Sequence, residues 1–314
     1  EGARRSNVSG LALMIAVIAE LWLVGRGWNP VVPTRWMYPE TPMLAKLREV
    51  TATQAKNEPF RIVGAGPVFF PNTSALYGYE DIRAHDPMAN GRYLGVLRVV
   101  GNYDTSDYFA KWNDFNTRLL DFLNVKYVLT PPKAELPDPA RYEMLYDGRD
   151  GRLFANRDAL PRFFAVRNVI LEFRDEHFAQ LLRSHTDYAH TALLEQLAVE
   201  NDQMRLDFLA PRAPDAPEAR TEIIEASPTS YRIHVVAPRY SLVASSIPWW
   251  PGWKVSRNGA RIDPIRVNGA FLGFAVPQGE LDVKVWYDPW SFRLGSILAA
   301  LTVLALVGIG IRKG

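Results

Sequence analysis

The chain has 314 residues, of which 48% are hydrophobic and 22% are charged, enough for two domains with cores of their own. Its 36 basic and 34 acidic residues give a net charge of +2, and no basic run lies mid-chain, so nucleic acid is not an expected partner. The absence of cysteine excludes disulfides, thiol catalysis and cysteine-held metals.

An apolar run near the N-terminus, Val8 to Val24, is long enough to cross a hydrocarbon core of about 30 Å. Arg4 and Arg5 precede it, which also fits a signal peptide. No small-x-small cleavage pattern follows the run, so we predict a transmembrane helix over residues 8–25.

Two further features of this end suggest that other spans exist. Glu20 lies inside the run, where an ionisable side chain is costly unless it reaches the interface or faces another helix, and we favour the interface. The chain starts at Glu1 instead of Met, so we expect a fragment or a processed chain, and favour the fragment.

Residues 31–209 are predicted to form an α/β domain, because helical and strand patterns alternate there. The predicted helices cover 41–50, 114–123 and 176–199, the last with a break near Thr186. The predicted strands cover 60–63 and 125–130, a hairpin turns at Asp147-Gly148 and Asp150-Gly151, and one or two strands lie within 162–173.

The turn-rich stretch after the first strand is the first candidate binding region, because ordered loops often carry binding groups. A carboxylate there could take a proton from a hydroxyl, and Arg83 could hold a phosphate. The alternative, which we favour, is a surface loop pinned by ion pairs and Asx turns. The candidate residues are Asn72, Asp81, Arg83 and Asp86, with Asp104 and Asp107 as further acids.

A proline-rich linker is predicted at residues 210–220, and after it the hydrophobic period changes to two. About seven short strands with Asn-Gly turns predict an antiparallel β-sandwich over residues 221–289. Trp249, Trp250 and Trp253 surround Pro251 and could form an aromatic platform for sugar rings or lipid, although core or interfacial packing is the favoured reading.

A second apolar run closes the chain and predicts a transmembrane helix over residues 292–311, preceded by an aromatic belt. Two spans place both termini on one side. The pairs Arg4/Arg5 and Arg312/Lys313 favour the cytoplasm for those ends, so the central domain is expected to be extracytoplasmic. The predicted fold is an α+β membrane protein fragment in which two transmembrane helices flank a small α/β unit and a C-terminal antiparallel β-sandwich.

Several segments, taken in order, resemble the bacterial YfhO-like membrane proteins. Leu123 to Thr130 resembles their L-x-V-K-Y strand, and Asn156 to Arg162 resembles their N-x-x-A-L-P-R turn. Trp249 to Val255 resembles their Y-P-G-W strand. Weaker matches to loop and turn elements are Pro71-Asn72-Thr73, Asp81-Ile82-Arg83, Arg266 to Phe271 and Val276 to Glu280.

The resemblance implies the C-terminal portion of a polytopic GT-C-type glycosyltransferase in the bacterial cytoplasmic membrane, which uses a polyprenyl-phosphate-linked sugar on the outer face. It implies as partners membrane lipid, the lipid-linked sugar, an envelope glycan and the remaining transmembrane helices. The family's catalytic carboxylate lies in an early loop, so no catalytic residue is assigned here. The alternative is a non-enzymatic, membrane-anchored carbohydrate-binding or envelope-assembly module.

No cofactor is expected in this chain, although a divalent metal could serve the full-length protein. The five histidines lack ligand spacing, because His185 and His190 are five residues apart, so we expect no metal site.

Overall fold

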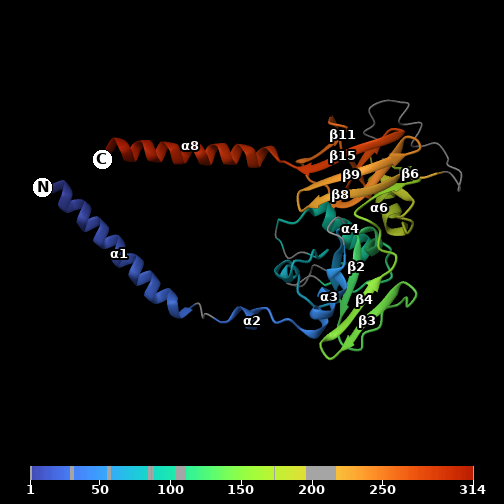
Figure 1. Ribbon diagram of the computed structural model, residues 1–314, viewed down its shortest axis with the longest axis horizontal. Coiled ribbons are helices and arrows are strands. Elements are labelled where there is room, and N and C mark those ends of the chain that lie inside the picture. Colours follow the sequence, from blue (N-terminus) through green and yellow to red (C-terminus); the bar gives the residue numbers. More distant parts are fainter. Residues whose placement is uncertain are drawn as a thin grey trace. The chain divides into compact units, whose positions relative to one another are not determined.

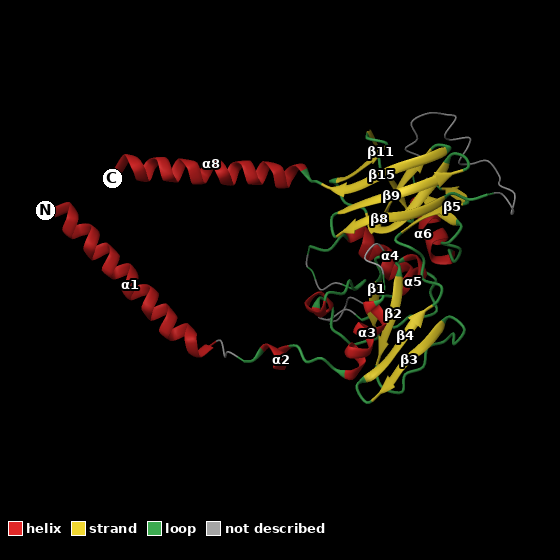
Figure 2. Cartoon of the chain, in the orientation of Figure 1, coloured by secondary structure: helices red, strands yellow, loops and turns green. Residues whose placement is uncertain are grey.

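The computed structural model describes residues 2–28, 32–54, 58–83, 86, 88–103, 111–172, 174–195 and 217–313. The chain divides into two compact units, Glu1–Thr41 and Pro42–Gly314. The first unit contains α1 (Gly2–Trp28) and the one-turn helix α2 (Thr34–Met37). The second unit contains the remaining elements, whose order can be followed in Figures 1 and 2.

A four-stranded sheet, in the order β1-β2-β4-β3, forms the first part of the second unit. Its strands are β1 (Arg61–Gly64), β2 (Val125–Thr130), β3 (Tyr142–Gly148) and β4 (Gly151–Asn156). β1 pairs in parallel with β2, and the other pairs are antiparallel. α3 (Pro42–Ala52) buries Met43, Leu44 and Leu47 in the core that it shares with this sheet, so the predicted first helix, both strands and the hairpin are confirmed.

The β-sandwich consists of a four-stranded sheet, β13-β14-β10-β5, and a five-stranded sheet, β12-β11-β15-β9-β8. The four-stranded sheet contains β5 (Phe163–Val166), β10 (Ser241–Pro248), β13 (Ile265–Val267) and β14 (Phe271–Val276). The five-stranded sheet contains β8 (Arg220–Ser227), β9 (Ser230–Ala237), β11 (Trp253–Arg257), β12 (Ala260–Ile262) and β15 (Gly279–Tyr287). All of their pairings are antiparallel, and their facing side chains form one core.

Short helices and a two-stranded sheet cover the outer face of the sandwich's four-stranded sheet, β13-β14-β10-β5. They are α4 (Gly91–Gly101), α5 (Leu119–Phe122), β6 (Asn168–Leu171), α6 (Asp175–Ser184) and β7 (Thr191–Leu194). The short 3₁₀ helix η1 (Thr73–Tyr77) instead packs Tyr77 against the core that α3 shares with the first sheet. One core joins the first sheet, α4, α5 and α6 to the sandwich strands, from Val63 through Phe122 to Phe271. The sandwich and the first sheet therefore share buried contacts.

Two helix predictions are wrong in their extents. Of the helix predicted over 114–123, Leu119–Phe122 is helical (α5). Residues 114–118 are not, because the Asp114 side chain accepts a hydrogen bond from the Asn116 amide at 2.9 Å, an Asx turn that competes with the helix. The helix predicted over 176–199 ends at Ser184, and Leu193 and Leu194 belong to β7, which pairs in parallel with β6. Residues 196–199 of that prediction lie outside the described residues.

The sandwich takes one strand from outside the predicted range. β5 pairs with β10 from Leu242↔Val166 to Ser245↔Phe163, although β5 precedes the predicted linker. Most of that linker, residues 210–216, lies outside the described residues. Eight strands follow it in the chain, compared with the seven expected.

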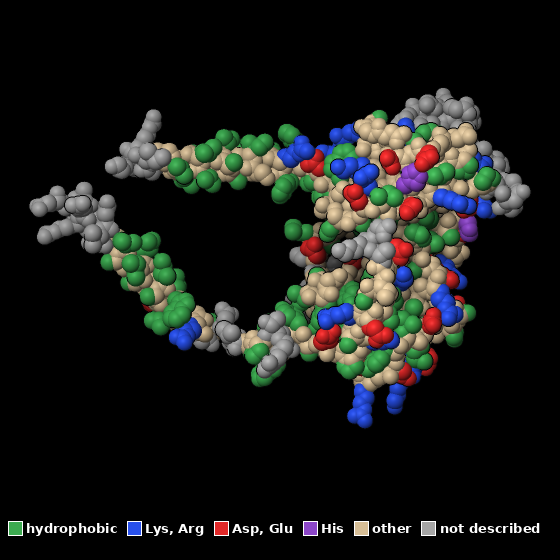
Figure 3. All heavy atoms as spheres, viewed as in Figure 1, with side chains coloured by type: hydrophobic (Ala, Val, Ile, Leu, Met, Phe, Trp, Pro, Cys, Tyr) green, Lys and Arg blue, Asp and Glu red, His purple; other side chains and the backbone are tan. Residues whose placement is uncertain are grey.

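The last helix, α8 (Trp290–Lys313), is apolar, and none of its span from Trp290 to Gly308 is buried against the protein. Among the described residues it is the one helix long and apolar enough to cross a membrane. No second helix of this kind is shown among the described residues, so the span predicted over residues 8–25, which lies within α1, stays a prediction. Figure 3 shows hydrophobic side chains along α8 and charged ones where it joins the sandwich.

Candidate functional site

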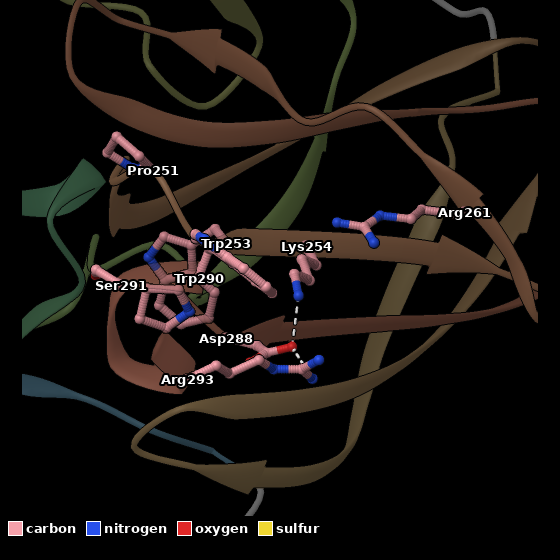
Figure 4. A pocket seen from close by; sticks show the side chains of 10 residues that line it. Pro251, Trp253, Lys254, Arg261, Asp288, Trp290, Ser291 and Arg293 are labelled. Carbon is pink, nitrogen blue, oxygen red and sulfur yellow. Dashed lines mark hydrogen bonds and ion pairs between the residues drawn. The ribbon is translucent and has the colours of Figure 1, made fainter. Parts of the chain in front are cut away.

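A pocket with a volume of about 490 Å³ lies where the sandwich meets the first turn of α8. Figure 4 shows Lys254 and Arg293 pointing toward Asp288, while Trp253 and Trp290 lie together at one side. Arg261, an exposed residue of β12, lines the same pocket. We call this hollow the membrane-proximal pocket.

Local sheet geometry brings these residues together. The register of β11 with β15 pairs Trp253 with Tyr287, and their rings lie 5.3 Å apart. The Asp288 amide donates to the carbonyl of Gly252 at 2.8 Å, which holds the end of β15 against the turn before β11. At Gly252 the φ angle is +120°, and an added side chain would press on Pro289, so the turn requires glycine.

Charge in the membrane-proximal pocket is predominantly positive. The Asp288 carboxylate accepts hydrogen bonds from Lys254 and from Arg293, the latter at 2.7 Å to Nε. These two bonds, Lys254 first, hold the pKa of Asp288 below its ordinary value. Three cations, Lys254, Arg261 and Arg293, line the pocket with one carboxylate, which leaves an excess of two positive charges for an anion.

The three predicted tryptophans differ in their surroundings, and the platform stays a prediction. Trp249 stacks on the Arg266 guanidinium at 4.5 Å and accepts a hydrogen bond on its carbonyl from Asn90 at 2.9 Å. Trp253 lines the membrane-proximal pocket, and both of these rings also pack against the sandwich core. Trp250 is the most exposed of the three, at 44%.

In the predicted loop region, Asp81 and Arg83 form a buried ion pair. The Arg83 Nη2 atom lies 2.8 Å from Asp81 Oδ2, and the two side chains are 0% and 2% exposed. Burial raises the pKa of Asp81, against the opposing effect of Arg83. Arg83 also donates to the carbonyls of Gly66, Val68 and Phe69, so it holds the loop that follows β1.

The other predicted loop residues lie at the surface. Asn72 is exposed, with a left-handed backbone (φ 73°) before η1. Asp86 is exposed and accepts a hydrogen bond from the Met88 amide at 2.8 Å. Asp104 and Asp107 lie outside the described residues. The binding role of Asn72, Asp81, Arg83 and Asp86 stays a prediction.

Four charged residues of the membrane-proximal pocket were missed by sequence reasoning: Lys254, Arg261, Asp288 and Arg293. Their signal in the sequence is a Tyr-Asp-Pro-Trp step directly before the apolar run, with an arginine one turn later. No group of histidine or acidic side chains suited to a metal occurs among the described residues.

Comparison with known proteins identifies one family. Residues 213–299, which include the sandwich from β8 onward and the start of α8, match the family model described as bacterial membrane protein YfhO. The C-terminal region of the chain is therefore YfhO-like. No curated protein and no solved structure gave a significant match.

Proposed function

We propose, from this YfhO-like C-terminal region, that the chain is the extracytoplasmic part of a polytopic membrane glycosyltransferase that uses a polyprenyl-phosphate-linked sugar. Its role is to position the donor, or the glycan acceptor, for a catalytic centre elsewhere in the full protein. The residues proposed to hold the phosphate of the lipid-linked sugar are Lys254, Arg261 and Arg293.

The observation that supports this role is the place of the membrane-proximal pocket. It lies at the first turn of the apolar helix α8, where a spanning helix would leave the hydrocarbon and meet the head-group layer. The phosphate of a lipid-linked sugar lies at that depth, with its polyprenyl chain in the hydrocarbon. Aromatic side chains such as Trp253 and Trp290 suit both the interface and the faces of sugar rings.

The pocket is suited to binding rather than to proton transfer. Asp288 is its one carboxylate, and the hydrogen bonds from Lys254 and Arg293 stabilise the ionised form. A general base would need a pKa nearer to the working pH. The catalytic carboxylate, and any divalent metal, would therefore belong to the rest of the protein.

The proposed topology has two spans, α1 and α8, with the second unit outside the cytoplasmic membrane of a bacterium. It is supported by the apolar surface of α8 and by the exposed apolar side chains of α1, such as Leu13, Leu21 and Leu23. The basic pairs at both ends favour this orientation.

The experiment is sugar transfer by the full-length protein in vesicles that contain a polyprenyl-phosphate-linked sugar. Arg261→Gln removes one charge from the pocket without unpairing Asp288, so KM for the lipid donor should rise by about tenfold while kcat changes little. Arg149→Gln, a change of an exposed arginine in the β3–β4 turn, is the matched control.

An unchanged KM in Arg261→Gln would reject the membrane-proximal pocket as the donor site. Absence of transfer with every lipid-linked sugar, together with binding of a glycan, would favour the second candidate function, a non-enzymatic carbohydrate-binding or envelope-assembly module. The exposure of Trp250 beside the pocket is the observation that favours this alternative.

A further inference from the structure

A second hollow, with a volume of about 630 Å³, lies between the first sheet and the sandwich. Four segments line it: residues between α3 and β1, residues around β2, the turn from Asn156 to Phe163 after β4, and the start of β8. We call it the Lys126 cleft. It brings together the two segments that carry the L-x-V-K-Y and N-x-x-A-L-P-R resemblances, which the membrane-proximal pocket does not use.

Lys126 contributes a positive charge that the fold does not neutralise. Its side chain is half-buried on β2, and no ion pair or hydrogen bond joins it to another residue of the described chain. A partly desolvated ammonium group gains most from an anionic partner. The cleft therefore presents a free cation to a ligand.

The wall behind Lys126 also carries an excess of positive charge. Arg61 and Arg162, whose side chains are 11% and 2% exposed, share one carboxylate, Glu80, at 3.3 and 2.9 Å. Arg162 lines the cleft, and its Nη2 atom is buried without a hydrogen-bond partner. Two buried guanidiniums with one half-exposed carboxylate leave a net positive charge, which an anion in the cleft would offset.

Neutral and acidic groups at the rim are suited to hydroxyls. Glu58 and Glu222 are exposed at the cleft and offer acceptor oxygens, and the Gln54 Oε1 atom is buried without a donor. Phe60 and Pro161 add an apolar surface of the kind on which sugar rings pack. A simple anion would leave the acceptors unused, and a neutral sugar would leave Lys126 unpaired.

We propose that the Lys126 cleft binds a sugar that carries an oxyanion, either a phosphate or a carboxylate group. The oxyanion would pair with Lys126, and the sugar hydroxyls would donate to Glu58, Glu222 and Gln54. This site is distinct from the membrane-proximal pocket. The proposal does not depend on the transferase role, because the experiment that tests it measures the binding of a sugar and not its transfer.

The test is calorimetric titration of the full-length protein in lipid nanodiscs with glucose, glucuronate, glucose 1-phosphate and inorganic phosphate. At least one of the two anionic sugars should bind about tenfold more tightly than glucose and than inorganic phosphate. The preference between glucuronate and glucose 1-phosphate identifies the oxyanion.

Variants of Lys126 locate the binding. Lys126→Gln should weaken the preferred anionic sugar by about tenfold, Lys126→Arg should retain most of the affinity, and Lys133→Gln, in the loop after β2, should leave it unchanged. Melting temperatures within a few degrees of the parent protein confirm that the variants fold. No binding of either anionic sugar, equal binding of glucose or of inorganic phosphate, or full affinity in a folded Lys126→Gln protein would each overturn the proposal.

Discussion

Glu80 joins two buried arginines that come from different parts of the fold. Arg61 begins β1, where its Nη1 atom also donates to the Ser246 carbonyl of β10 at 3.0 Å. Arg162 precedes β5, and its Nε donates to Asn124 at 3.1 Å. Burial would raise the pKa of Glu80, but the charges of Arg61 and Arg162 outweigh it and hold that pKa below its ordinary value.

Replacing Glu80 tests this arrangement. Glu80→Gln should lower the free energy of unfolding at pH 7 by about 2 kcal/mol, because two buried guanidiniums lose a shared carboxylate that is itself half-exposed to screening solvent. Chemical denaturation followed by tryptophan fluorescence measures the change. Glu49→Gln, which removes an exposed partner of Lys46, should have little effect.

The effect of Glu80 should depend on pH in a defined direction. A carboxylate whose pKa is lowered by folding contributes its full stability above its ordinary value of 4.5, and loses it as the pH falls through the lower folded value. The difference in unfolding free energy between the parent protein and Glu80→Gln should therefore shrink from pH 6 toward pH 3. A difference independent of pH would show that Glu80 acts by packing alone.

Arg83 offers a comparison of structural and binding roles within one predicted site. Arg83→Ala should lower the free energy of unfolding by about 3 kcal/mol, because it leaves Asp81 buried without its cation and three loop carbonyls without their donor. Asp86→Asn, at an exposed position, should leave stability unchanged. If Arg83→Ala lost sugar transfer while keeping the parent stability, the binding interpretation would gain over the structural one.

At this scale the sequence predicts residue types better than their partners. Trp253 was considered for an aromatic platform, with core or interfacial packing favoured, and it both packs against the sandwich core and lines a pocket, whereas its charged neighbours there were missed. Lys254 and Asp288 are 34 residues apart, and their contact depends on the register of β11 with β15. That register is set by the packing of both strands into the sandwich core, so it cannot be predicted from the sequence pattern of either strand.

Among the elements, α4 was not predicted, and its packing depends on a glycine. Its start is capped by Asn90, which accepts hydrogen bonds from the amides of Arg92 and Tyr93. At its last residue, Gly101, a methyl group would overlap the ring of Trp112, which is fully buried. The helix can pack this closely only because that position has no side chain.

Two of the three glycines of α4, Gly95 and Gly101, give a matched pair. Gly101→Ala should destabilise the protein by about 2 kcal/mol through overpacking. Gly95→Ala, in open space within the same helix, should stabilise it by up to about 1 kcal/mol because alanine is the better helix former. Thermal unfolding of both variants gives the comparison, and a shift of the same sign in both would contradict the packing argument.

The extents of the other helices show where local patterns fail. Leu193 and Leu194 have helical spacing with Leu197, yet they form β7. They do so because β7 pairs in parallel with β6, the strand that precedes α6 in the chain. The sequence alone does not distinguish a leucine pair in a buried strand from one on a helix face. Long-range pairing decided the outcome here, whereas β2 and the β3–β4 hairpin were predictable from their own residues.

For the whole molecule, the central expectation is attachment to a bilayer at both ends. Deleting residues 290–314 should leave the protein in the membrane fraction if α1 spans, and deleting residues 1–41 should leave it there through α8. Deleting both should release the second unit into the soluble fraction. Carbonate extraction and sedimentation measure each case. If deletion of residues 290–314 alone released the protein from the membrane fraction, α8 would be the transmembrane helix and α1 would not span.

The general architecture was predictable because period-two patterning and apolar length are local signals. A mixed α+β protein with a C-terminal sandwich and an apolar last helix follows from those signals, and the structure contains both. The share of the sandwich that comes from β5 was not predictable, because Phe163 to Val166 reads equally well as a strand of the first sheet. The Lys126 cleft depends on the same long-range assembly.

The position of β5 determines what happens when the chain is cleaved or expressed as two fragments. β5 pairs with β10, although β5 precedes residue 195 and β10 follows residue 217. Cleavage between residues 195 and 217 would therefore give two polypeptides that both contribute strands to the same sheet. Neither fragment would retain a complete hydrophobic interior if expressed alone. Co-expression of residues 1–195 and 217–314 should reconstitute the fold as a non-covalent pair.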